Sequence, residues 1–415
     1  MTTGALSGIA TPASWKWQEL WATMPRIKEI DGQNLTPLSV YLDSGVVPRD
    51  SRVDNHNQLG EDLSRYLVVR PDDVVFNKLR TWQGGLGYSK YHGIVSPAYF
   101  VCRPKTTLDS RFIHYLLRSK PYLAELTRIS KWMPPSQFDT PWETLRKLPL
   151  LLPPPEEQRR IADFLDGEIA RIEMLVQLRS RQLDLLAERC AAALNQQFQD
   201  HSFRPTRLKY LLAVKPRYGV LVPAFADEGV RFIRVNDLLD LPGRADTLAR
   251  IPTELSSQYS RTVTQSGDIL LSVVGTMGRA TVVPPELTGA NVARAVASLR
   301  TISGIPPELI ATWMTTPDFH RQAIEATASD TAQPTLGMED LSNFQLAWPA
   351  ETQIQTNLLS ATTRIHNHQK SLGHALQTQQ KLLTERRQAL ITAAVTGQFD
   401  VSTASGRNVT DGVNA

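Results

Sequence analysis

The chain has 415 residues, too many for one ordinary hydrophobic core, and this favours two domains of roughly 150 residues with connectors. A hydrophobic content of 41% and a charged content of 21% are typical of a folded protein and exclude an intrinsically disordered one. The formal charge of +4 permits nucleic-acid binding without arguing for it, because a clustered basic patch matters more than a sum.

Residue usage also bears on the cellular compartment. Two cysteines, Cys102 and Cys190, are too few for a disulfide framework or a cysteine-bound metal cluster, which fits a reducing cytoplasm. The first residues lack the charged start and apolar stretch of a signal peptide, and no apolar run is long enough to predict a membrane span. Small polar residues over 1–14 and 401–415 predict disordered tails.

Residues 15–152 predict a first globular domain that mixes strand-like and loop-like stretches rich in glycine, proline and aromatics. Residues 153–200 then predict a long helix, because three prolines and two glutamates suit a helix start and no glycine–proline breaker follows. Its apolar side chains recur in steps of four and three residues, as in a coiled-coil seam. The seam comprises Leu165, Ile169, Ile172, Val176, Leu183 and Leu186.

Residues 201–349 predict a second domain that repeats the first at a nearly constant offset. With a shift of 195 positions, residues 71–74 align with 266–269, 96–98 with 291–293, 150–154 with 345–349 and 156–158 with 351–353. With a shift of 197, residues 185–189 align with 382–386. The alternative is a coincidental likeness of loops, but one offset held over so long a stretch indicates a duplicated domain-plus-helix unit.

Residues 350–400 predict the second long helix, with a less regular seam at Leu372, Leu376, Leu383 and Leu390. Neither seam can stay exposed, so we expect the two helices to pack on each other, antiparallel. Two separate oligomerisation helices are the alternative. The expected fold is therefore a duplicated mixed α/β (α+β) chain in which two globular domains alternate with two paired helices.

Signatures of catalysis are missing from the sequence. No Asn/Asp-Pro-Pro-aromatic loop of an adenine methyltransferase and no phosphate-binding GxxxxGK[ST] loop occurs. The eight histidines show no HExxH or Cys/His spacing, so no metal site is expected. The glycines at 84–87 predict a turn more readily than a cofactor loop. We therefore expect no catalytic residue and no cofactor on this chain.

Four segments resemble the specificity subunits of type I restriction–modification systems. Residues 148–175 (LPLLLPPPEEQRRIADFLDGEIARIEML) are similar to the start of their central helical region, and 382–401 (LLTERRQALITAAVTGQFDV) to the close of their second one. Residues 70–104 and 266–283 are similar to parts of their two target-recognition domains. The chain departs at 351–353, where Glu-Thr-Gln replaces a proline-preceded Glu-Gln, and in its more polar second seam.

The resemblance implies a non-catalytic reader of double-stranded DNA. Each domain would bind one half of a split site, and the helix pair would set the gap between halves. Two modification (methyltransferase) subunits would dock on this chain, and motor–nuclease subunits would join for restriction. S-adenosylmethionine, ATP and Mg²⁺ would then belong to those partners, with no membrane involved.

Basic and aromatic residues of each domain are the candidates for DNA contact, because cations bind phosphates and Arg, Asn and Gln read base edges. The first domain offers Lys78, Arg80, Trp82, Tyr88, Lys90, Tyr91 and His92 in a Gly-rich loop, then Lys131, Trp132, Ser136 and Gln137 before the helix. The second offers Ser272, Thr276, Arg279, Asn291 and Arg294, then Ser329, Gln333 and Thr335. Trp82 and Trp132 are more typical of core anchors than of residues that stack on bases.

Two other functions stay open at this level. A self-contained methyltransferase or nuclease with a divergent site would bind a cofactor by itself. A coiled-coil adaptor would need no DNA, although basic and aromatic loops at repeated positions argue against it. Within the family, the partner subunits could also be lost or silent, and the bases recognised are not encoded in any readable motif.

Overall fold

The computed structural model describes residues 6–9, 12–30, 32, 34–51, 62–133, 137–200, 202–275, 277–328 and 334–401. The chain forms two units: unit 1 holds residues 1–178 and 379–415, and unit 2 holds residues 179–378. Each unit combines one globular domain with half of each of two long helices, α5 (Pro155–Gln197) and α10 (Thr352–Val395). Over the described ranges, none of the helices has the length and apolarity needed to cross a membrane.

In unit 1, the first and last strands of the domain pair antiparallel, which places the chain's exit at the start of α5. These strands are β1 (Lys16–Glu19) and β12 (Pro149–Leu152). The central sheet has the order β2 (Arg26–Ile27), β9 (Tyr99–Cys102), β6 (Val74–Asn77) and β7 (Leu86–Tyr88). Smaller antiparallel pairs are β3 (Leu38–Tyr41) with β4 (Gly45–Pro48), β5 (Leu67–Val69) with β8 (Gly93–Val95), and β10 (Lys131–Met133) with β11 (Gln137–Asp139). The helices are α1 (Leu20–Thr23), α2 (Ser110–Leu117), α3 (Lys120–Ile129) and α4 (Trp142–Leu145).

Unit 2 repeats this order. Its first and last strands, β13 (Arg204–Arg207) and β21 (Gln345–Trp348), pair antiparallel before α10. The central sheet has the order β14 (Leu212–Tyr218), β20 (Val296–Thr301), β17 (Ile269–Ser272) and β18 (Ala280–Val282). A second sheet joins β16 (Ala249–Ile251), β15 (Val230–Ile233) and β19 (Asn291–Val292), and the helices are α6 (Thr253–Gln258), α7 (Pro307–Trp313), α8 (Pro317–Ala326) and α9 (Met338–Asn343).

An ion pair between a buried aspartate and a half-buried arginine occurs at the same place in both units and confirms the predicted duplication. In unit 1, the buried Asp73 carboxylate accepts hydrogen bonds from Arg103 Nε and Nη2, at 2.8 and 2.9 Å. In unit 2, Asp268 accepts from Arg300 Nε and Nη2, at 2.6 and 2.8 Å. Each aspartate directly precedes a strand of the central sheet, β6 in unit 1 and β17 in unit 2. Arg103 directly follows the neighbouring strand β9, and Arg300 lies in the neighbouring strand β20. The two aspartates are 195 positions apart and the two arginines are 197 positions apart, so the offset between the copies changes from 195 to 197 between the aspartate and the arginine.

The helices begin in the same way in both units, but the second start lies two residues later than the sequence alignment placed it. In α5, the buried Gln158 donates from Nε2 to the carbonyl of Pro153, at 2.9 Å. In α10, the buried Gln355 donates from Nε2 to the carbonyl of Pro349, at 3.0 Å. Gln355, and not Gln353, is therefore the counterpart of Gln158.

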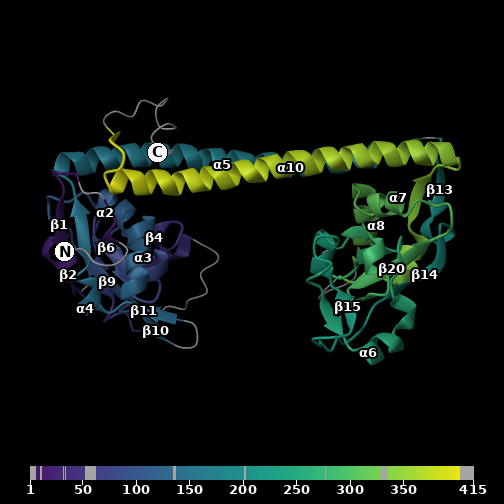
Figure 1. Ribbon diagram of the computed structural model, residues 1–415, viewed down its shortest axis with the longest axis horizontal. Coiled ribbons are helices and arrows are strands. Elements are labelled where there is room, and N and C mark those ends of the chain that lie inside the picture. The colour runs from purple at the N-terminus through teal and green to yellow at the C-terminus, as the bar shows by residue number, and fades with distance from the viewer. Residues whose placement is uncertain are drawn as a thin grey trace. The chain divides into compact units, whose positions relative to one another are not determined.

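The two long helices run antiparallel where they close unit 1, as predicted (Figure 1). Glu173 of α5 pairs with Arg387 of α10 at 3.4 Å, and the carbonyl of Val176 accepts from Gln380 Nε2 at 3.3 Å. Residue numbers therefore rise along α5 as they fall along α10. Buried side chains of both helices join the domain's own core, which comprises α5 residues Ile161, Ala162, Leu165 and Ile169 and α10 residues Leu390, Ile391, Ala394 and Val395.

The structure places the predicted α5 seam along one face: Leu165, Ile169 and Ile172 are buried, and Val176, Leu183 and Leu186 are half-buried. The α10 seam differs from the prediction at one position. Leu372 is 41% exposed, while its neighbour Gly373 lies on the covered face with Leu376, Leu383 and Leu390. The prediction was wrong there because it selected the apolar residue, whereas the helix turns by about 100° per residue and the register selects position 373.

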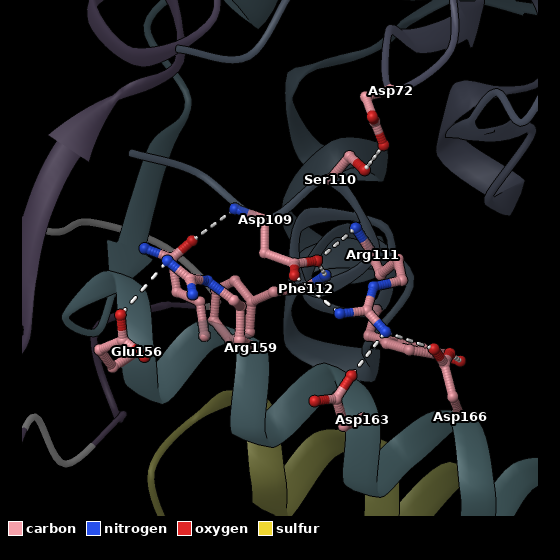
Figure 2. Close-up of polar contacts among 11 residues, drawn as sticks. Asp72, Asp109, Ser110, Arg111, Phe112, Glu156, Arg159, Asp163 and Asp166 are labelled. Atoms are coloured by element: carbon pink, nitrogen blue, oxygen red, sulfur yellow. Dashed lines mark hydrogen bonds and ion pairs between the residues drawn. The ribbon is translucent and has the colours of Figure 1, made fainter. Parts of the chain in front are cut away.

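A polar network joins the start of α2 to the flank of α5 within unit 1 (Figure 2). Asp109 caps α2 by accepting from the backbone N–H groups of Arg111 and Phe112. The Arg111 guanidinium pairs with Asp109, Asp163 and Asp166 at 2.7 to 2.9 Å. The hydrogen bond from Arg111 to Asp109, and then those to Asp163 and Asp166, raise the pKa of Arg111 against the opposing effect of burial. The network fixes the domain on its helix.

The expected disorder of residues 1–14 is wrong for part of that range. Leu6 is fully buried in the core of unit 1, and Ile9 packs against the same core. Phe399 packs on Phe164 of α5, with ring centroids 5.7 Å apart. Burial of Leu6 and Ile9 is enough to hold the N-terminal segment on the domain, although their neighbours in the sequence are small and polar. Residues 1–5 and 402–415 lie outside the described residues.

Candidate nucleic-acid interface

The Gly-rich segment predicted as one DNA-binding loop is divided between the two ends of a β-hairpin. Strands β6 and β7 pair with Phe76 opposite Leu86 and Val74 opposite Tyr88. Lys78, Arg80 and Trp82 therefore lie in the connection between the strands, and the residues after Tyr88 lie at the opposite end. The sequence prediction was wrong to treat them as one loop, because residues 86–88 form a strand.

At the connecting end of this hairpin, two cations lie over one aromatic ring. Lys78 Nζ is 4.9 Å from the Phe100 ring centroid, and the Arg26 guanidinium is 4.7 Å from the same centroid. Lys78 Nζ also donates to the carbonyl of Pro97. Partial burial, and next the Arg26 charge, lower the pKa of Lys78, while Asp139 opposes the shift. Two cations held this close repel each other, and an anion such as a phosphate would relieve the repulsion.

The two loops predicted in the first domain meet at this end. The Thr140 backbone N–H donates to the carbonyl of Lys78, at 3.0 Å, and so ties the β10–β11 hairpin to the connection after β6. The ring of Phe138 lies between two tryptophans, 4.7 Å from Trp82 and 4.9 Å from Trp132. Trp82 is half-buried, but Trp132 is 53% exposed and stands beside the exposed Lys131.

Unit 2 joins its two predicted loops by equivalent backbone bonds. The Leu336 N–H donates to the carbonyl of Val273, at 2.9 Å, as Thr140 does to Lys78. The Val273 N–H donates to the carbonyl of Ala295 at 3.0 Å, as the Lys78 N–H does to the carbonyl of Ala98 at 3.1 Å. Of the cations predicted in this unit, Arg294 is exposed and Arg279 is half-buried. Thr335 is half-buried and forms a bridge with Val274.

Two residues predicted to contact DNA are part of the core of unit 2 instead. Ser272 is fully buried, and its hydroxyl accepts from the Arg279 backbone N–H at 2.9 Å. Asn291 is fully buried, donates to Ser256 Oγ at 3.1 Å and accepts from Thr262 Oγ1 at 2.8 Å. Both side chains satisfy internal hydrogen bonds and leave no surface for a base edge. With the later offset of 197, Asn291 corresponds to the buried strand β8, which the loop alignment missed.

The remaining predicted residues fall into two groups, those that the structure describes and those that lie outside the described residues. Tyr88 is half-buried, with its ring 5.7 Å from the His114 ring in an edge arrangement, and so serves the core. Lys90, Tyr91 and His92 are exposed at the far end of the hairpin. The second group lies outside the described residues and comprises Ser136, Thr276, Ser329 and Gln333, together with the side chain of Gln137.

Three features of this surface were missed from the sequence. Arg26 is far from Lys78 along the chain, so only the pairing of β2 with β9 brings them to the same ring. Phe138 closes a loop that reads as polar. In unit 2, the residues after the buried Val220, from Leu221 to Phe225, form an exposed loop. An apolar stretch interrupted by Pro223 was the one signal that could have indicated the loop.

The described residues contain no group of three or more His, Cys, Asp or Glu side chains placed to hold a metal ion. What this surface offers is chemistry of binding: exposed cations, aromatic rings and backbone groups on loops fixed by a sheet. Loops positioned by a rigid scaffold are a common way to present binding residues.

No protein-family model matches the chain. A type I restriction enzyme EcoBI specificity subunit from Escherichia coli is 27% identical over 235 residues, covering 50% of this chain and 49% of that relative. The chain thus matches about half the length of this curated relative. A chain solved in work on the assembly and conformational transition of the type I R-M system superposes with a TM-score of 0.69 at 20% identity, covering 94% of this chain and 100% of that one. The HsdS subunit from Thermoanaerobacter tengcongensis gives a TM-score of 0.52 at 20% identity, covering 95% and 99%. The chain therefore has the fold of type I specificity subunits over nearly its whole length and resembles one of them in sequence over half of it.

Proposed function

We propose that this chain is the DNA-reading, non-catalytic subunit of a type I restriction–modification complex. Each unit would bind one half of a split site in double-stranded DNA, and the paired helices would set the gap. The observation that carries the proposal is the repeated junction of two loops, fixed in both units by equivalent backbone hydrogen bonds and bearing exposed cations.

The two junctions have different side chains on the same backbone. Unit 1 presents Lys78, Arg80, Lys131 and Trp132, and unit 2 presents Arg279 and Arg294. Phosphate contacts fix the position of a protein on the duplex, whereas the side chains that reach base edges decide the sequence. Different side chains on a shared scaffold should therefore give two different half-sites.

The catalytic work falls to partners under this proposal. Two modification subunits would bind S-adenosylmethionine, and motor–nuclease subunits would use ATP and Mg²⁺. The purified chain alone should then show no S-adenosylmethionine binding by calorimetry, while its complex with the modification subunit should bind it. Binding to the isolated chain would favour the alternative of a self-contained methyltransferase.

The decisive experiment is genome-wide mapping of adenine methylation in cells that express the modification subunit with and without this chain. We expect a motif of two short defined halves around a fixed undefined gap, present only with the chain. Lys131→Ala and Arg294→Ala should each weaken methylation of all sites or relax one half. A motif that persists without the chain would contradict the proposal.

A further inference from the structure

Unit 2 exposes an apolar loop beside its junction of loops. Leu221 is 53% exposed, Val222 is 74% exposed and Phe225 is 60% exposed. Exposed apolar residues are ordinary when scattered, but three large ones within five positions form a cluster that is typical of a binding surface.

The loop is fixed at both ends, so its tip is held in place. At its start, the Val220 N–H donates to the carbonyl of Val292 at 2.8 Å, and the Arg294 N–H donates to the carbonyl of Val220 at 2.9 Å. At its end, the Ala226 N–H donates to the backbone carbonyl of Arg250 at 3.0 Å. The chain approaches β19 so closely that a Cβ on Gly219 would lie 2.0 Å from the Val292 carbonyl oxygen, which requires glycine there.

Beneath the tip, the loop is supported by a small core of its own. Val220 is fully buried with Phe232 and Ile251. The ring of Phe225 stands edge-on to Phe232, with centroids 6.2 Å apart. Leu221 and Val222 are thus presented to solvent by a packed base, although their burial in the fold would be the more stable arrangement.

The occupant is indicated by the neighbouring charge. Arg294, which bonds directly to the start of the loop, is an exposed cation of the proposed DNA-binding junction. The Tyr218 hydroxyl, just before the loop, donates to the carbonyl of Leu336 at 2.7 Å, in the second loop of that junction. A ligand that binds Arg294 through an anionic group therefore meets an apolar patch next to it. Duplex DNA has this combination, because the 5-methyl group of thymine lies at the base edge between the phosphates.

We propose that Leu221 and Val222 contact thymine methyl groups in the half-site bound by unit 2; this proposal rests on the proposed function. The contact belongs to one half-site only. In unit 1, a parallel bridge also joins Pro37 to Ile94, but the apolar residues that follow Pro37, Leu38 and Val40, are buried in β3.

The test uses the complex of the full chain with its modification subunit and duplexes carrying the mapped motif. Each thymine is replaced in turn by deoxyuridine, which removes only the methyl group. Burial of one methyl group predicts about a fourfold loss of affinity for the wild-type complex at one or more positions of one half-site. The Leu221→Ser/Val222→Ser double variant should bind the thymine duplex about as weakly as the wild type binds the deoxyuridine duplex, and should not distinguish the two.

The matched control is Ile302→Ser. Ile302 is 43% exposed and directly follows the last residue of β20, whereas Arg294 precedes the first residue of that strand. Ile302 is therefore an exposed apolar residue at the opposite end of the strand from Arg294. This variant should keep the wild-type preference for thymine. Equal thymine preference in the double variant and the wild type, or no preference at any position, would overturn the inference while leaving the split motif intact. Loss of the modification subunit from the double-variant complex would also overturn it, by showing that the loop binds protein. If no split motif is methylated at all, the proposed function fails with it.

Discussion

At the scale of single residues, the two copies of the fold solve the same backbone problem with different side chains. Asp72 has a φ of +70°, the left-handed region that non-glycine residues rarely adopt, and its counterpart in unit 2 is Gly267 with a φ of +85°. The aspartate is held by the hydroxyl of Ser110, which donates to Asp72 Oδ1 at 2.6 Å (Figure 2). The hydrogen bond offsets the backbone strain in the first copy, and glycine avoids that strain in the second.

This comparison predicts the effect of substitution at position 72. Asp72→Gly loses the bond to Ser110 but relieves the strain, so the free energy of unfolding should change by less than about 1 kcal/mol. Asp72→Val loses the bond and keeps a β-branched side chain in the left-handed region, which should cost about 2–3 kcal/mol. Urea unfolding of the full chain measures both. A glycine variant as unstable as the valine variant would show that the hydrogen bond, and not the backbone, dominates.

His114 is a buried histidine whose protonation should lower the stability of the fold. Its Nδ1 atom is enclosed, with no hydrogen-bond partner among the described residues. Burial, and next the charges of Arg118, Arg387 and Lys90, lower its pKa from 6.5 to about 3. The folded chain therefore binds this proton less tightly than the unfolded chain does. The contribution of His114 to stability is complete above the ordinary pKa and declines as the pH falls from about 6.5 towards 3.

A His114→Phe variant tests this effect, because it keeps an aromatic ring against Tyr88 without an ionisable group. Between pH 6 and pH 4, the wild type should lose up to about 1.4 kcal/mol of stability per pH unit through this residue. The variant should lose correspondingly less, as read from melting temperatures across the pH range. His92→Gln, at an exposed histidine, serves as the control and should follow the wild-type profile. Identical pH profiles for His114→Phe and the wild type would contradict the assignment.

At the scale of elements, the register of α10 decides which of its leucines lie on the covered face and which are exposed. Polar side chains occupy the covered face at Gln380 and Arg387, and each has a partner on α5. Apolar spacing alone therefore assigned Leu372 to the wrong face. Polar residues in a helix seam lower its stability but fix the register in which the two helices pair.

Two leucine-to-alanine substitutions distinguish the observed register from the predicted one. Leu390→Ala removes a fully buried side chain and should lower the free energy of unfolding by about 3 kcal/mol. Leu372→Ala, at an exposed position, should cost less than about 0.5 kcal/mol. Denaturant unfolding of the full chain measures both, and equal costs would favour the register expected from sequence.

At the scale of the whole molecule, each long helix belongs to both units, so its length should matter for how two half-sites are read together. Deleting one heptad from residues 165–193, with a matched heptad from α10, removes about 10.5 Å of helix, or the length of about three base pairs. Under the proposed function, the gap of the methylated motif should change by a few base pairs while both halves stay the same. Altered halves with an unchanged gap, seen by the same methylation mapping, would refute the role of the helices as a spacer.

The sequence by itself determined the duplicated organisation, the two long helices and the α5 seam, because these depend on local signals: proline before a helix, glycines at turns and apolar residues at regular spacing. It also identified the pairs of loops that carry the candidate site. Only the tertiary structure decided which of their side chains are available. Pairing of β6 with β7 separated Lys78 from Lys90, burial in β19 and its surroundings removed Asn291, and the sheet brought Arg26 to the ring of Phe100. Strand pairing and burial depend on residues far apart in the chain, and no local pattern records which of them will meet.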